Sequence, residues 1–181
     1  MIPSKFIRRS PVALVLAALA LVAVGCGPSA KEEMAATYCP APFSVQDAVS
    51  LTRFRAGPGR DPGDVVFEAG MGEATSDCKL GKTQMELTLR VQVAAVAGPA
   101  VGGGAVSVPY FVRVIGPSGA IVQGREFEAT FKLSASRPRG ASMEELTLRL
   151  PFDKLADVAA YRIAVGLKPT QEELEYNRRS R

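Results

Sequence analysis

Residues 85–94 alternate between apolar and polar side chains with a period of two. Successive side chains of an extended strand point to opposite faces, so this period places every apolar residue of the segment on one face. The segment therefore predicts a strand with one buried face. The apolar positions are Met85, Leu87, Leu89, Val91 and Val93.

Similar patterns mark further strands, and Gly/Pro-rich turns such as Gly57–Gly63 and Gly116–Gly119 separate them. About seven or eight short strands with turns between them predict an all-β fold, an antiparallel β-sandwich. A single antiparallel sheet packed against a helix is the alternative. The remaining strands are expected within residues 49–54, 64–71, 106–115, 120–122, 127–133, 146–150 and 161–167.

Leu155 and Tyr161 are six residues apart where the last two predicted strands join. This spacing resembles that of fibronectin type III and immunoglobulin-like domains, in which the tyrosine forms a corner between two strands. The resemblance implies a sandwich of this kind, which we place at residues 39–168.

The last segment, residues 169–181, is predicted to be a helix and a tail. Thr170 and Glu173 have the spacing of a capping box, so we expect a helix from about Gln171 to Arg179. We expect Leu174 or Tyr176 to pack back on the sandwich. The arginines at the helix end would then either complement the helix dipole or meet an anionic surface.

The first 25 residues have the organisation of a secretory signal peptide. They contain no acidic residue, and Lys5, Arg8 and Arg9 precede an apolar stretch, Pro11–Val24. This stretch has 14 residues, whereas a membrane-spanning helix needs about 20. A basic region, a short apolar region and small residues at its end indicate an exported protein.

The end of this segment resembles the lipobox of bacterial lipoproteins, because Ala23, Val24 and Gly25 precede Cys26. Ala23 stands where leucine is the commonest residue of that motif. The resemblance implies cleavage before Cys26, a diacylated thiol at Cys26 and acylation of the new amino group. Two or more acyl chains anchor a protein stably. An ordinary cleaved signal or an uncleaved anchor is the alternative.

The residue after the cysteine bears on which membrane holds the protein. In the best-studied Gram-negative sorting systems an aspartate there retains a lipoprotein in the inner membrane, and this chain has Gly27. The resemblance implies the periplasmic face of the outer membrane, with the inner membrane as the alternative. We expect residues 26–38 to be a flexible tether with a span of about 20 Å.

The net charge of +4 owes most of its excess to the signal segment. That segment carries three of the 22 basic residues and none of the 18 acidic ones, so its removal leaves 19 against 18, a net charge of +1. No basic face is implied, and we expect no nucleic-acid partner.

The chain has three cysteines. If Cys26 carries lipid, Cys39 and Cys78 remain, and export places them in an oxidising compartment. We therefore expect a Cys39–Cys78 disulfide, the one intramolecular pairing that is left. It would close a loop of roughly 40 residues, for which chain entropy predicts about 4 kcal/mol of stabilisation.

Catalytic motifs are not evident in the sequence. The chain has no histidine, so a Ser-His-Asp or Cys-His set is impossible. Val101–Ala105 is glycine-rich but lacks the Gly-Lys-Ser/Thr of a phosphate loop. Adjacent glutamate pairs occur in solvent-like contexts. We expect no enzymatic activity, no catalytic residue, no cofactor and no metal site.

Arg53, Arg55 and Arg60 lie close together in sequence near Phe54 and form a candidate site for an anionic group such as a lipid phosphate. Asp61 and Asp64 could instead neutralise these arginines.

Three segments resemble an uncharacterised family of small bacterial lipoproteins, over most of residues 39–179. The resemblance implies a family and no activity. We expect a membrane-anchored envelope protein that binds or scaffolds a protein or glycan partner. The alternatives are a periplasmic enzyme that uses carboxylates or arginines, and a lipid or polysaccharide carrier. The segments are Leu51–Asp61, Val108–Val112 and Glu173–Arg179.

Overall fold

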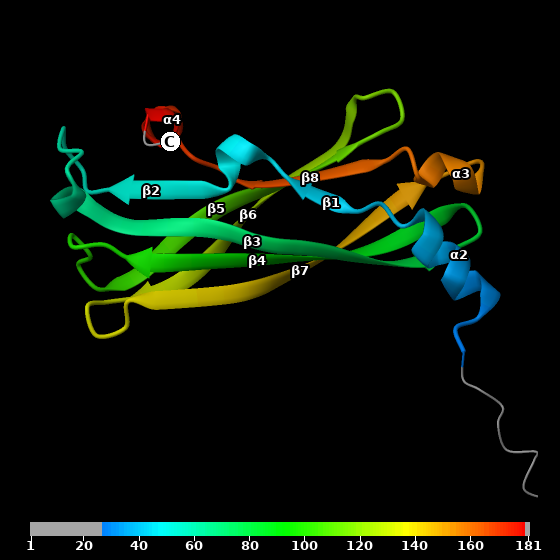
Figure 1. Cartoon of the computed structure of the whole chain (residues 1–181), viewed down its shortest axis with the longest axis horizontal. Helices are drawn as coiled ribbons and strands as arrows, with labels where there is room; N and C mark the ends of the chain where they lie inside the picture. The colour runs from blue at the N-terminus through cyan, green and yellow to red at the C-terminus, as the bar shows by residue number, and fades with distance from the viewer. Residues whose placement is uncertain (1–26, 180–181) are drawn as a thin grey trace, which may run out of the picture.

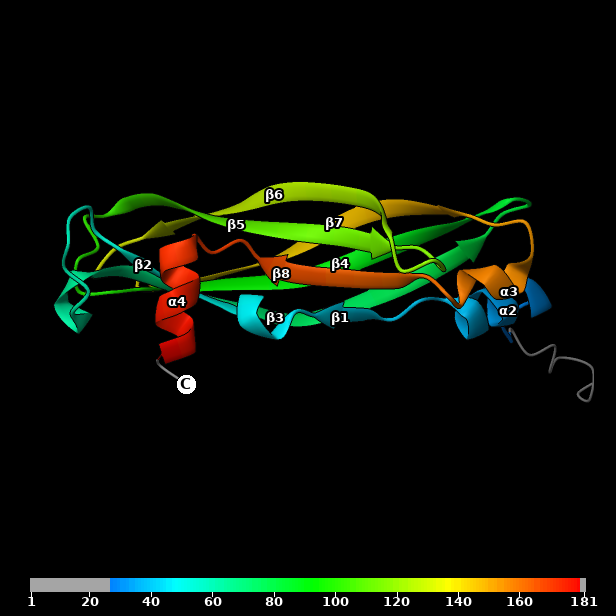
Figure 2. The same cartoon turned by 90° about the horizontal axis from the view of Figure 1, so that it is seen from above.

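The computed structural model describes residues 27–179, which form two stacked four-stranded β-sheets with short helices at the ends (Figures 1 and 2). The strands are β1 Pro42–Ser44, β2 Ser50–Phe54, β3 Val65–Leu80, β4 Gln84–Ala97, β5 Gly104–Ile115, β6 Ile121–Leu133, β7 Arg139–Pro151 and β8 Arg162–Leu167. The helices are α2 Ala30–Tyr38, α3 Leu155–Val158 and α4 Gln171–Arg179, with 3₁₀ turns η2 Gln46–Ala48 and η3 Pro62–Asp64.

The sheets have the strand orders β1-β8-β5-β6 and β2-β3-β4-β7. The predicted sandwich is thus confirmed, and the single-sheet alternative is wrong. All neighbouring strands run antiparallel except β1 and β8, which are parallel. The chain crosses from β4 to β5 in the other sheet and returns from β6 to β7, so β7 pairs with β4.

The core lies between the two sheets, and β4 supplies its centre. The five apolar residues that alternate in the sequence are all fully buried, which confirms the prediction from their period. Tyr110, Ile163 and Leu167 face them from the other sheet. In β8 the residues from Ile163 to Leu167 are buried on both faces, because η2 packs over the outer one near Gly166.

The corner between β7 and β8 is built as the leucine–tyrosine spacing predicts. Tyr161 lies directly before β8, and its hydroxyl donates a hydrogen bond to the Pro151 carbonyl at the end of β7 (2.9 Å). Leu155 packs against the core from α3. The corner therefore joins the two sheets at this end of the molecule.

The predicted C-terminal helix is confirmed, with the predicted bounds and both capping bonds. The Glu173 amide donates to the Thr170 hydroxyl (3.3 Å), and the Thr170 amide donates to the Glu173 carboxylate (2.8 Å). The helix packs on β2, where the Tyr176 ring meets Phe54 edge-on at a centroid distance of 4.9 Å.

The prediction of a flexible tether over residues 26–38 is wrong for most of that segment, because α2 occupies residues 30–38. A second capping box begins this helix, since Ser29 and Glu32 bond each other's backbone amides. Ala35 is buried against the sandwich. The signal segment and Cys26 lie outside the described residues, as does Arg181.

The two ends of the molecule differ in what closes them. Helices α2 and α3 lie together at one end, which we call the α2–α3 end, and α4 with the loop of η3 lies toward the other, the α4 end (Figures 1 and 2). Within residues 27–179, the helices are all too short or too polar to cross a bilayer.

Candidate functional site

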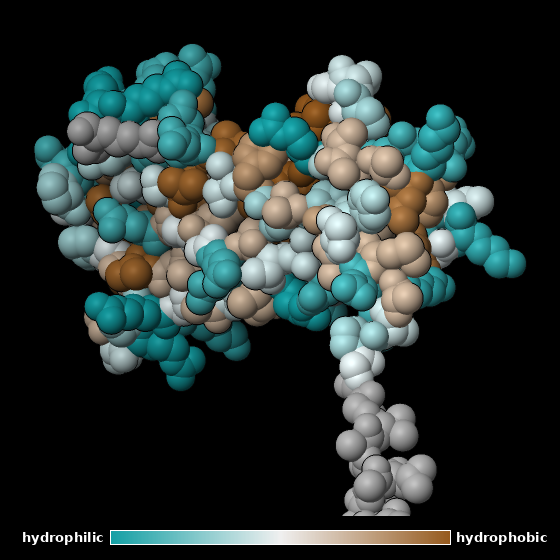
Figure 3. Space-filling view, turned by 45° about the vertical axis from the view of Figure 1, so that its right-hand side comes forward, coloured by the Kyte–Doolittle hydropathy of each residue, from teal (hydrophilic) through white to brown (hydrophobic). Residues whose placement is uncertain are grey.

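The three arginines predicted to bind an anion come together at the α4 end. Arg53 lies in β2, and Arg55 and Arg60 lie in the loop that follows it. All three line one hollow of about 210 Å³ beside the start of α4. Hydrophilic side chains gather over this end of the molecule (Figure 3).

Each of these three guanidinium groups forms an ion pair with a carboxylate. Arg53 Nε lies 2.5 Å from Glu173 Oε1, Arg55 pairs with Asp64, and Arg60 pairs with Glu172. Glu173 and Asp64 are buried, and a buried carboxylate is stable only with a charged or hydrogen-bonding partner. An incoming anion would have to displace these carboxylates, so the geometry favours a structural role for the cluster.

Arg60 also orders the loop around it. Its Nη1 donates to the carbonyls of Gly57 and Gly59, and its guanidinium lies 5.3 Å from the centre of the Phe54 ring. Gly57 has a φ of 123°, a backbone conformation that favours glycine. The loop, β2 and α4 are therefore tied into one unit.

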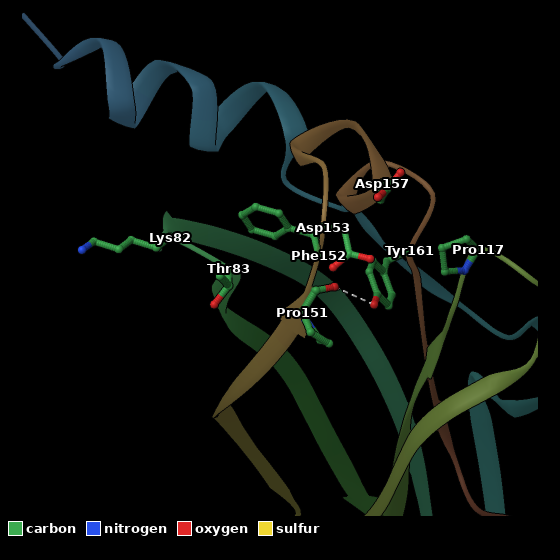
Figure 4. A pocket seen from close by; sticks show the side chains of 8 residues that line it. All are labelled: Lys82, Thr83, Pro117, Pro151, Phe152, Asp153, Asp157 and Tyr161. Carbon is green, nitrogen blue, oxygen red and sulfur yellow. Dashed lines mark hydrogen bonds between the residues drawn. The ribbon is translucent and has the colours of Figure 1, made fainter.

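A larger hollow lies at the α2–α3 end, where the β3–β4 turn, the β5–β6 turn and the segment after β7 meet (Figure 4). Its volume is about 710 Å³. Lys82 extends away from the aspartates in Figure 4. The lining residues are Lys82, Thr83, Pro117, Pro151, Phe152, Asp153, Asp157 and Tyr161.

The polar groups of this cleft have structural partners or face water. The Asp157 carboxylate accepts a bond from the Lys154 amide at the start of α3 (3.1 Å), and the Tyr161 hydroxyl serves the corner described above. Asp153 and Asp157 are exposed. The polar groups of the cleft therefore hold the fold together or are open to water.

Tyr110, whose side chain points between the two sheets, has a raised pKa. Burial, followed by the nearby charge of Glu144, raises the pKa of Tyr110 to about 12. Its hydroxyl donates to a Glu144 carboxylate oxygen at 3.4 Å. Both side chains lie between the sheets near the β7 edge, away from both hollows. The pair therefore belongs to the packing of the sandwich.

The predicted disulfide between Cys39 and Cys78 is present, with the two Cα atoms 5.6 Å apart. It joins the residue after α2 to β3. In the part of the chain that the structure describes, no group of three or more metal-binding side chains comes together.

The sequence predicted that the three arginines lie close together, but it did not predict two of their carboxylate partners. Asp64 is close in sequence to Arg55, whereas Glu172 and Glu173 come from the far end of the chain. The cleft at the α2–α3 end was also missed, because three separate turns build it and none carries a motif.

No protein-family model matches the chain. No curated protein matches it at a significant level. The resemblance to small bacterial lipoproteins therefore stays a prediction.

Proposed function

We propose that the protein is a lipoprotein held by acyl chains on Cys26 at the periplasmic face of the outer membrane. Its sandwich serves as a non-enzymatic module that binds or scaffolds another envelope component. The signal segment and the residues before Cys26 motivate the anchor. The position of α2 relative to Cys26 is the observation that carries the proposal.

Helix α2 begins at Ala30, so only Gly27, Pro28 and Ser29 separate it from Cys26. Three extended residues reach about 10 Å. The helix is fixed to the sandwich by the burial of Ala35 and by the disulfide that follows Tyr38. Lipid on Cys26 would therefore hold the α2–α3 end, and the cleft in Figure 4, against the membrane surface.

The same arrangement carries the α4 end away from the membrane. Strand β3 has 16 residues and connects the two ends, and a strand rises about 3.3 Å per residue. A module of this length spans about 50 Å. The domain would thus present one end to lipid and the other to the periplasm, as a short envelope scaffold requires.

Three observations favour binding over catalysis or transport. The charged groups at the α4 end neutralise each other, and the carboxylates of the cleft face water. A carrier would need an apolar cavity between the sheets, whereas fully buried side chains such as Leu87, Leu89 and Leu133 pack together there.

The anchor is tested by labelling cells with a clickable fatty acid. The wild-type chain should be labelled, and Cys26→Ser should remain an unlabelled, unprocessed precursor. Equal label in the two proteins would contradict the lipid anchor.

The scaffold is tested by placing a photo-crosslinking amino acid at Thr83, beside the cleft, or at Glu175 on α4, both of which are exposed. We expect lipid adducts from position 83 and a discrete protein or glycan adduct from position 175 in the anchored protein. Lipid adducts from position 175 instead would reverse the proposed orientation and overturn the proposal.

A further inference from the structure

A sandwich of two sheets has four edge strands, and three of them are short, covered or irregular. Strand β1 has three residues. Helix α4 packs on β2, where Asn177 donates to the Ser50 carbonyl (2.8 Å). Strand β6 has an extra residue, Val122, where its register against β5 shifts, and four of its side chains are charged. Natural proteins protect sheet edges in such ways because a bare edge pairs with other strands.

The fourth edge, β7, is regular and largely bare. It has 13 residues and pairs with β4 without a bulge from end to end. Gln123 of β6 donates to the Arg149 carbonyl (2.8 Å) and covers the edge there. In Figure 1 the strand forms a border of its sheet, with β4 on one side only. Residues 139–147 are therefore left as an open pairing surface.

Hydrogen bonds at both ends of β7 identify which backbone groups face outward. The Pro138 carbonyl accepts from Ala97 after β4, and the Phe152 amide donates to Thr83 before it, so even-numbered residues bond toward β4. The Arg149 carbonyl points the other way, toward Gln123. Because the direction alternates along a strand, the free amides and carbonyls belong to the odd-numbered residues 139–147.

We propose that two copies of the chain pair β7 to β7, antiparallel and centred on Ser142, to form one continuous eight-stranded sheet. This inference goes beyond the proposed function and does not depend on the anchor. In this register each free odd-numbered residue meets another. Residue 139 faces residue 145 of the second copy, and residue 141 faces residue 143. The four pairs would form about eight backbone hydrogen bonds.

The side chains of the bare stretch are self-complementary in this register. Arg139 would face the partner's Glu145, and Ala141 would face the partner's Met143, which is 59% exposed in the single chain. A two-fold axis repeats each pair. Opposite charges across two strands stabilise the pairing, and like charges oppose it. A register centred on Glu144 would instead place Arg139 against Arg149.

The charges on the outer face of the sheet lead up to this edge. Arg90 of β4 lies between two carboxylates, pairing with Asp77 of β3 and, at 3.0 Å, with Glu145 of β7. The charges therefore alternate from negative on β3 to positive on β4 and negative on β7, the edge strand. A positive side chain on a strand added next to β7 would continue this alternation. Among residues 27–179, Arg139 forms no ion pair within its own chain, so it is available for that place.

An unsatisfied hydroxyl lies on the proposed two-fold axis. Ser142 Oγ is buried and has no hydrogen-bond partner among the described residues, an arrangement that native proteins seldom keep. In the register centred on Ser142, the two copies of this side chain lie opposite each other on the inner face. Directly opposed Cβ atoms are about 5 Å apart, which brings one hydroxyl within reach of the other.

Cysteine crosslinking of the full-length, membrane-anchored protein tests the register. Ser142→Cys should form a covalent dimer on mild oxidation, one that reducing agent dissolves, since the two Cα atoms would lie within the range that a disulfide bridges. Thr147→Cys on the same strand is the matched control, because it would face position 137 and should stay monomeric. Equal crosslinking of the two variants, or a crosslink to a different protein, would overturn the proposal.

Charge exchange tests the pairing independently of any new cysteine. Arg139→Glu should weaken the dimer of purified full-length protein by about tenfold or more, because two attractive pairs become repulsive. Glu145→Arg alone should do the same. Mixing the two variants should restore a heterodimer, since every facing pair is then opposite in sign. Failure of the mixture to associate, or wild-type protein that is monomeric by light scattering, would refute β7 pairing.

Discussion

The two ends of the molecule are closed by helices of equal length that begin in the same way and are fastened differently. Helices α2 and α4 each have nine residues and a capping box. A disulfide and a buried alanine fasten α2. Helix α4 depends on ion pairs to Arg53 and Arg60, a hydrogen bond to Ser50 and one aromatic contact.

This difference matches the two environments that the proposed anchor would create. A covalent bond keeps its strength in high salt and at low pH as long as the compartment is oxidising. Ion pairs that are partly exposed weaken with both. The end proposed to lie at the membrane is thus fastened permanently, and the end proposed to face the periplasm is fastened reversibly.

Removal of the disulfide should have the largest effect. Cys39→Ala/Cys78→Ala should lose about 4 kcal/mol of unfolding free energy, because the bond closes a loop of roughly 40 residues in the unfolded chain. Denaturant titration measures the loss. Wild-type protein in reducing agent should match the variant, and an unchanged midpoint in both would show that α2 is held by packing alone.

Loss of the Arg53 charge should come next. Arg53→Leu leaves the buried Glu173 carboxylate without its cation, and we expect a loss of about 2 kcal/mol, less than for a fully buried pair because Arg53 is 37% exposed. Hydrogen exchange should show α4 opening before the sheets.

Arg178→Leu is the matched control, since its pair with Asp47 is exposed on both sides, and it should cost at most about 1 kcal/mol. Equal effects of the two variants would mean that burial of Glu173 does not matter.

The capping residues should contribute less to stability than the disulfide or Arg53. Their loss should fray α4 more than α2. Thr170→Ala and Ser29→Ala should each cost about 1 kcal/mol of helix stability. Protection at residues 171–179 should fall in Thr170→Ala while the β-domain stays folded. The disulfide should limit fraying in Ser29→Ala to the first turn of α2. Full protection of α4 in Thr170→Ala would refute the capping account.

The smallest effect should be the response of α2 to acid. The bond from the Ser29 amide, followed by that from its hydroxyl, lowers the pKa of Glu32. A lowered pKa means that this stabilisation is present above the unfolded glutamate value of about 4.3 and is lost as the pH falls through the folded pKa. The protection factor at the start of α2, which takes account of the slower intrinsic exchange at low pH, should therefore fall in acid. Glu32→Gln should abolish that dependence, and a dependence that persists would assign it to another group.

Local sequence rules predicted the elements whose determinants are local. The period of two found β4 and its buried face, and the Thr170–Glu173 spacing found α4. The same capping spacing is present at Ser29 and Glu32. The resemblance of the preceding residues to a lipobox suggested a tether instead, and α2 was missed. Here the information was in the sequence and a stronger local pattern obscured it.

Long-range pairing explains the other differences. The second half of β3 is largely polar, and the first half of β7 is polar and contains Gly140. Both segments become strands because each pairs along β4. The ion pairs of Arg53 and Arg60 join residues more than a hundred positions apart. No spacing rule reaches that far, so the partners of the predicted arginines could not be read from the chain.

The parallel pairing of the first strand with the last has a consequence for biogenesis. Phe43 of β1 pairs with Ala164 of β8, so under the proposed export this part of the sheet would not form until nearly the whole chain had crossed the inner membrane. Loops that long close slowly. The exported chain would therefore spend its passage unfolded, as a translocation channel requires, and would complete its fold only after its C-terminal residues had emerged.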